Sequence, residues 1–224
     1  MSSPIRYTEE IGMYSFSRGR VACRWQTEWC TKNCYAAKFY RLGWSKDEYD
    51  VAYNSYWRGV ESDQFVSDVL KANNHGIPAR FRFAVCGEIW AKPSDVEKVY
   101  LIMYQMPETL FWIPTRAWHD GNMAEAIERL ILPMDNARVL ASVDPDTTED
   151  EFVWLRHRNW SMVFAGDNSD PNQMLLAPGG TQEKLTARMH RCEKTWDQLS
   201  GRCATCEQGC FAPGSVRVHL KQHR

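Results

Sequence analysis

The alternation of apolar and polar positions along the chain predicts five strands. In each segment, apolar residues alternate with polar ones or form a short continuous run, as is typical of strands. The five segments span residues 13–17, 80–85, 110–113, 138–143 and 161–165. The connections between them are long enough for helices, which parallel strands require.

The connecting segments carry apolar residues at helical spacing. Pro93 suits a first helical turn, because the N–H that proline lacks is not needed there. Strands that alternate with helices form a parallel sheet with the helices outside. The expected fold class is therefore α/β, as a partial (β/α) barrel or an open parallel sheet. Helices are expected at residues 35–40, at 46–71 with a break near Gly59, from Pro93 onward, at 124–130 and after Thr148.

A polar segment rich in Asn, Asp, Pro and Gly follows the fifth strand and reaches Gly180. We expect a domain boundary there. Residues 1–180 would form the partial barrel, and residues 181–224 a cysteine-rich C-terminal module. A chain of 224 residues is long enough for one sizeable core with such an appendage.

Charge and hydropathy narrow the class of protein. The chain is 44% apolar with a net charge of −1, which gives no electrostatic case for bulk nucleic-acid binding. It has no apolar run of the roughly 20 residues that cross a bilayer and no secretory signal, so we expect a cytoplasmic protein without a membrane partner. Basic residues gather in a C-terminal strand and tail, at Arg217, His219, Lys221, His223 and Arg224.

Seven of the eight cysteines fall into two sets. The first set is Cys23, Cys30 and Cys34, with the spacing C-x6-C-x3-C. Thiolates held within a few ångströms repel one another unless a cation lies between them, and zinc and iron–sulfur clusters suit such sites. Since disulfides are rare in cytoplasmic proteins, the sequence predicts a metalloprotein. The second set is Cys192, Cys203, Cys206 and Cys210, with the spacing C-x10-C-x2-C-x3-C.

The two sets predict different sites. Three thiolates leave one iron of a [4Fe–4S] cluster, or one position on zinc, open for a substrate or cofactor. Cys86, after the second strand, is either a fourth ligand that closes this site or a small buried side chain. The second set completes a coordination shell by itself, for zinc or a second cluster, as a staple for the tail or as an electron relay.

Polar residues follow the strands at their carboxyl ends, where parallel α/β proteins place reactive groups. Gly87 and Glu88 follow the second strand, Arg116 the third, Asp144 the fourth and Asp167 the fifth. Each residue alone is also typical of a helix cap, a turn or an ion pair. Their recurrence favours a catalytic edge, with the three carboxylates in acid/base or positioning roles and the arginine as an anion clamp.

Several motifs together resemble the phage gene product 88 family. They are Ser15-Phe16-Ser17 before the first cysteine set, Val85-Cys86-Gly87-Glu88, Thr115-Arg116-Ala117-Trp118, and Val216-Arg217-Val218-His219-Leu220 near a cysteine-rich end. The resemblance covers most of the chain. It implies a protein that acts in the cytoplasm of an infected host.

The cysteine triad after the first strand and the Gly-Glu pair after the second are in turn similar to radical S-adenosylmethionine proteins. The usual spacing of the triad in that superfamily is C-x3-C-x2-C. There the triad holds a [4Fe–4S] cluster, and the Gly-Glu loop contacts the amino group of S-adenosylmethionine. The resemblance implies that Cys23, Cys30 and Cys34 hold the cluster and that Gly87 and Glu88 meet the cofactor.

Two functions follow as hypotheses. The first is an iron–sulfur enzyme that uses a cluster at the barrel mouth, with S-adenosylmethionine or as a Lewis acid. Its substrate would be a small molecule, and the phage context suggests a nucleotide or a nucleic-acid base. The second is a non-catalytic module, stabilised by zinc or a cluster, that binds nucleic acid or a host protein through the basic C-terminal residues.

Overall fold

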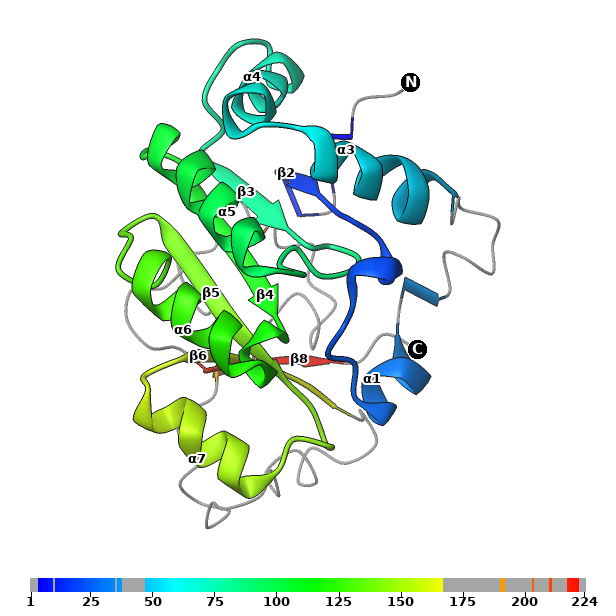
Figure 1. The fold of residues 1–224 in the computed structure, drawn as a ribbon, viewed down its shortest axis with the longest axis vertical. Coiled ribbons are helices and arrows are strands. Elements are labelled where there is room, and N and C mark those ends of the chain that lie inside the picture. The colour runs from blue at the N-terminus through cyan, green and yellow to red at the C-terminus, as the bar shows by residue number, and fades with distance from the viewer. Residues whose placement is uncertain are drawn as a thin grey trace.

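One mostly parallel sheet runs through the described part of the protein (Figure 1). In the computed structural model the described residues are 4–9, 11–34, 36–37, 47–166, 190–191, 203, 210 and 217–221. The strand order across the sheet is β1-β2-β3-β4-β5-β6-β8-β7, and only the β1–β2 pair is antiparallel. The strands are β1 (Arg6–Thr8), β2 (Met13–Phe16), β3 (Arg80–Phe83), β4 (Leu110–Thr115), β5 (Ala137–Val143), β6 (Ser161–Gly166), β7 (His190–Arg191) and β8 (Arg217–Lys221).

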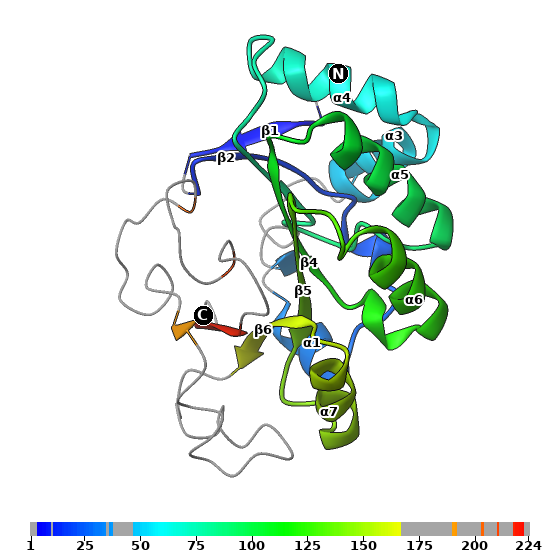
Figure 2. The same cartoon turned by 90° about the vertical axis from the view of Figure 1, so that its left-hand side faces the viewer.

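Helices α3 to α7 cover one face of this sheet (Figure 2). From β2 to β6, strands that are neighbours in the sheet are also consecutive in the chain. Crossovers between parallel strands are right-handed, so a sheet wound in one direction keeps its helices on one side. The helices are α1 (Glu28–Asn33), α3 (Asn54–Gly59), α4 (Ser62–Ala72), α5 (Pro93–Gln105), α6 (Gly121–Leu130) and α7 (Glu149–His157), with a π-helical segment (Asp47–Tyr53) before α3 and 3-10 turns at Arg20–Ala22 and Ala117–His119.

Local sequence explains where several of these helices begin. The Asp120 carboxylate accepts hydrogen bonds from the amides of Asn122 and Met123 at the start of α6. The Thr148 hydroxyl and the Glu151 carboxylate form a reciprocal capping box at the start of α7. Such caps satisfy the amides that the first helical turn leaves without partners.

The two faces of the sheet carry separate apolar clusters. The helix-covered face holds the larger one, in which the fully buried rings of Phe81, Phe83 and Phe111 contact one another and Phe83 stacks on Phe111. The opposite face holds a smaller cluster of Ile11, Met13, Trp112, Leu140 and Val163, against which Leu110, Cys203 and Cys210 pack. Successive residues of a strand point to opposite faces, which is why β3 alternates phenylalanines with Arg80 and Arg82.

The α/β prediction is confirmed, and all five expected strands are present as β2 to β6. The expected break near Gly59 is also present, since α3 ends there and α4 begins at Ser62. Among the described strands and α-helices, β1, β7 and the helix α1 before Cys34 were not expected. Of the helix expected at residues 35–40, residues 36–37 are helical and the rest lies outside the described residues.

The C-terminal segment contributes to the same sheet. Residues 217–221, part of the expected basic strand and tail, form β8 between β6 and β7. The backbone of β8 is therefore hydrogen-bonded on both sides. The domain boundary expected at residue 180 lies outside the described residues. Among the helices that are described, none has the length and apolar character needed to traverse a bilayer.

Candidate functional site

The loops after β2 and β3 touch through their backbones. Gly19 and Gly87 form an isolated parallel bridge, and the Cys86 amide donates a hydrogen bond to the Ser17 hydroxyl at 3.1 Å. Gly19 has φ +82° and Gly87 has φ +88°, in the region that favours glycine. The closeness of the two glycines places the segment that leads to Cys23 against the Cys86-Gly87-Glu88 segment.

This contact gathers the first cysteine set beside Cys86. Cys23, Cys30, Cys34 and Cys86 are half-buried and form no disulfide bonds. Burial raises the pKa of Cys23 far above its usual value, and the negative charges of Glu88 and of the other three thiolates raise it further. A thiol with that environment stays protonated unless a cation lies nearby. The structure thus brings together the first set, Cys86 and Glu88.

In the present conformation the thiols are not drawn together around a single ion. In the described part of the chain, no three His, Cys, Asp or Glu side chains are grouped closely enough to hold a metal ion. A single zinc ion needs its thiolate sulfurs at about 2.3 Å from one centre. In a [4Fe–4S] cluster each thiolate binds a different iron, so the ligands are spread more widely. The described side chains therefore show no site for a single metal ion.

Helix α1 carries Cys30 and is anchored to the loop after β5. The Thr27 hydroxyl donates to Asp144 Oδ2 at 2.6 Å and also accepts from the Cys30 amide at 3.0 Å. The Trp29 amide donates to Asp146 Oδ2 at 2.5 Å. These bonds join residues 117 positions apart in the chain. They fix the position of Cys30 relative to the carboxyl edge of the sheet.

Arg116 lies between Cys30 and Asp144. Its Nη2 forms an ion pair with Asp144 Oδ2 at 2.6 Å, and the Asp144 side chain is completely buried. Burial raises the pKa of the Cys30 thiol, while the positive charge of Arg116 lowers it. Arg116 Nη1 is buried and has no hydrogen-bond partner among the described residues. The two N–H donors of Nη1 are thus available to an anion at this edge.

Replacing Thr27 by valine is expected to destabilise the protein by about 1–2 kcal/mol, since the N-cap of α1 and the bond to Asp144 are both lost. Thr27→Ser keeps the hydroxyl and is expected to stay within about 0.5 kcal/mol of the wild type. Urea denaturation of both variants measures the difference. Equal stabilities of the two variants would show that the Thr27 hydroxyl does not anchor α1.

Glu88 is an internal brace between the loops after β3 and β4. One carboxylate oxygen accepts from the amides of Ile89 and Trp90, and the other accepts from the Thr115 hydroxyl and the Arg116 amide. Burial raises the pKa of Glu88 to about 7, and these four hydrogen bonds oppose the rise. The carboxylate is 5% exposed and directs both oxygens at the protein. Its hydrogen bonds fix the Arg116 backbone relative to the loop after β3.

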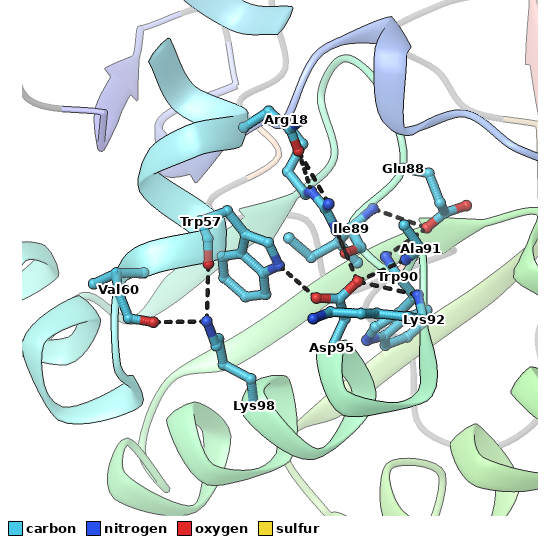
Figure 3. Close-up of polar contacts among 11 residues, drawn as sticks. Arg18, Trp57, Val60, Glu88, Ile89, Trp90, Ala91, Lys92, Asp95 and Lys98 are labelled. Atoms are coloured by element: carbon cyan, nitrogen blue, oxygen red, sulfur yellow. Dashed lines mark hydrogen bonds and ion pairs between the residues drawn. The ribbon is translucent and has the colours of Figure 1, made fainter. Parts of the chain in front are cut away.

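A buried ion pair that sequence reasoning missed supports the same loop (Figure 3). Arg18 Nη1 donates to Asp95 Oδ2 and to the Ile89 carbonyl, both at 2.8 Å. Asp95 also accepts from Trp57 Nε1 at 3.0 Å and from the amides of Ala91 and Lys92 at 2.9 and 3.1 Å. The only local signal was Asp95 in the first turn after Pro93, which is typical of a helix start. Nothing in the sequence around Arg18 points to its partner.

The remaining candidate residues do not join this edge within the described residues. Asp167, Cys192 and Cys206 lie outside the described residues. Cys203 and Cys210 are half-buried and pack on the helix-free face of the sheet. The described members of the second set are thus placed on a different surface from the first set.

The sequence model of the Gene product 88 family matches residues 4–217. The match spans β1 to β7, the first cysteine set, Cys86 and all four cysteines of the second set, and it ends at the first residue of β8. No curated protein and no solved structure matches the chain. The family agrees with the one that the cysteine spacing and the Val85–Glu88 motif indicated. The chain belongs to the phage gene product 88 family.

Proposed function

We propose that the protein is an iron–sulfur enzyme with a [4Fe–4S] cluster held by Cys23, Cys30 and Cys34 at the carboxyl edge of the sheet. The observation that carries the proposal is the convergence of three half-buried thiols from one loop on the Cys86-Gly87-Glu88 loop. The sequential order of β2 to β6, with helices on one face, is also the winding of a partial (β/α) barrel.

The residues around the thiols suit a reaction with an anionic ligand. A cluster with three protein ligands supplies an open iron for Lewis-acid or electron-transfer chemistry. Arg116 is held by Asp144 through Nη2 and keeps its Nη1 without a partner among the described residues. We infer that Nη1 would bind a carboxylate or phosphate. Glu88 and the Arg18–Asp95 pair hold the loops in place. S-adenosylmethionine as the cofactor, and a nucleotide or nucleic-acid base as the substrate, remain part of this proposal.

A second candidate function is favoured by the closeness of Cys86 to Cys23. If Cys86 is a fourth ligand, the centre is closed and has no coordination position for a substrate. The protein would then be a metal-stabilised module that binds nucleic acid or a host protein. Its basic contact residues would come from β8 and the residues after it.

Anaerobically purified wild-type protein is expected to contain iron and sulfide and to absorb at about 400 nm, as iron–sulfur clusters do. Cys30→Ala is expected to lose the cluster of the first set. Cys86→Ala is expected to keep it, because Cys86 is not a ligand in the enzymatic proposal. Iron, sulfide and zinc contents of the three proteins are the measurement.

Each alternative result has a distinct meaning. Loss of the cluster in both variants would make Cys86 a ligand and would support the closed, non-catalytic module. A wild-type protein that contains zinc and no iron under anaerobic conditions would exclude the iron–sulfur enzyme and leave the zinc-stabilised module. Thermal unfolding of each variant separates loss of ligand from loss of fold.

A further inference from the structure

The helix-free face of the sheet carries a row of side chains that the proposed function does not use. The ladder places Arg82 beside Trp112 and Trp112 beside Arg138. Paired residues in adjacent strands point to the same face. Trp112 belongs to the cluster of the helix-free face, so both arginines lie on that face too. In Figure 2 this is the side of the sheet opposite the helices.

The two arginines of this row differ in their partners. Arg138 Nη1 donates to the carbonyls of Asp135 and Ala137, both at 2.8 Å. Arg82 lies over the Trp112 ring, with its guanidinium carbon 4.2 Å from the ring centroid. Arg82 Nε is buried without a hydrogen-bond partner, and no carboxylate among the described residues forms an ion pair with this arginine.

A half-buried guanidinium without an anion is costly, because removing a charge from water needs compensation. Stacking on tryptophan supplies a part of this compensation. A negative group close to Arg82 would supply the remainder. No described carboxylate pairs with Arg82. The negative group would therefore come from other residues that pack on the same face.

Two cysteines of the second set pack on the cluster that contains Trp112. Cys203 and Cys210 both contact it, although they come from the distant end of the chain. Arg80, which shares the face of Arg82 on β3, donates from Nη1 to the Cys203 carbonyl. Four thiolates around zinc or a [4Fe–4S] cluster carry a net negative charge, because the thiolates outnumber the positive charge of the centre.

We propose that Cys203 and Cys210 bind a metal centre on the helix-free face of the sheet, where Arg82 supplies the compensating positive charge. This inference concerns a different surface from the proposed catalytic edge and does not depend on the metal in the first set.

The test uses the full-length protein with a metal chelator. The metal contents of Cys203→Ala and the wild type are compared first. The metal that is lost in the variant is assigned to the second centre. Arg82→Gln is expected to release that metal to EDTA about tenfold faster than the wild type, since about 1.4 kcal/mol of lost charge compensation corresponds to a factor of ten. Arg138→Gln, with the same substitution in the same row, is the matched control and is expected to release it at the wild-type rate.

Arg82→Lys separates charge from packing. It keeps the positive charge and loses the flat stacking on Trp112, so its release rate is expected to lie closer to the wild type than that of Arg82→Gln. Equal release rates for Arg82→Gln and the wild type would overturn the proposal. So would release from Arg82→Lys as fast as from Arg82→Gln, or a Cys203→Ala protein with the full wild-type metal content.

Discussion

Replacing Gly87 by alanine is expected to lower the free energy of unfolding by more than about 3 kcal/mol and to abolish the metal binding that we propose for the first cysteine set. A Cβ at this position would lie 1.9 Å from the Gly19 carbonyl oxygen and 2.6 Å from its carbonyl carbon. Because both are backbone atoms, the two loops have to separate. The φ of +88° adds about 1 kcal/mol for any residue with a Cβ. Urea denaturation and iron content measure the two effects.

Gly59→Ala is the matched control for this substitution. No atom lies within 4 Å of a Cβ built at Gly59, at the end of α3. Alanine also favours helix over glycine, so the control is expected to leave stability unchanged or to raise it by up to about 1 kcal/mol. If Gly87→Ala were as stable as Gly59→Ala, the loops after β2 and β3 would not be in backbone contact.

Asp95→Asn is expected to destabilise the protein by about 3–5 kcal/mol, as the breaking of a buried ion pair does. The side chains of Arg18 and Asp95 are 6% and 3% exposed, so Arg18 would keep a buried charge without a counterion. The new amide nitrogen would also face the donors that Asp95 now accepts from. Urea denaturation measures the change. Iron content is expected to fall as well, because Asp95 holds the loop that continues from Cys86.

Glu28→Gln makes the same chemical change in an exposed ion pair. Lys32 and Glu28 are 69% and 78% exposed, and such pairs contribute about 0.5 kcal/mol or less. The control is therefore expected to unfold almost as the wild type does. A loss of less than about 1 kcal/mol in Asp95→Asn would mean that the Arg18–Asp95 pair does not brace the loop after β3.

Two contacts between neighbouring loops hold the candidate site together. The Gly19–Gly87 contact joins the loops after β2 and β3, and the Glu88 carboxylate joins the loop after β3 to that after β4. Arg116 then reaches Asp144 after β5. Neighbouring loops are thus tied in the order of their strands. A substitution that displaces one loop would also displace the thiols. We therefore expect large losses of stability from substitutions at residues that contact no cysteine.

Local patterns were sufficient for the elements of the α/β region. The alternation of Phe81 and Phe83 with arginines predicted β3, and Pro93 predicted the start of α5. These signals depend on residues a few positions apart, which the sequence displays directly. β1 was not predicted, because a three-residue strand at the edge carries too short a pattern.

The candidate edge was predicted in part. The rule that loops follow the carboxyl ends of parallel strands placed Cys86, Glu88, Arg116 and Asp144 near the first cysteine set, and their contacts agree with this placement. Their individual roles did not follow from the rule. Glu88 and Asp144 have their oxygens engaged by the protein, which the strand-end position could not reveal.

By itself, the sequence determined the order of β2 to β6 with helices between them, the α/β class and the two thiol sets, because each depends on residue type and short spacing. Only the tertiary structure decided which distant residues meet: Arg18 with Asp95, 77 positions apart, and the helix-free face with Cys203 and Cys210. A contact between two distant buried charges, or between two distant glycine backbones, produces no repeating pattern in the sequence that could predict it. It depends on how crossovers bring separate loops together, and those contacts exist only once the sheet is wound.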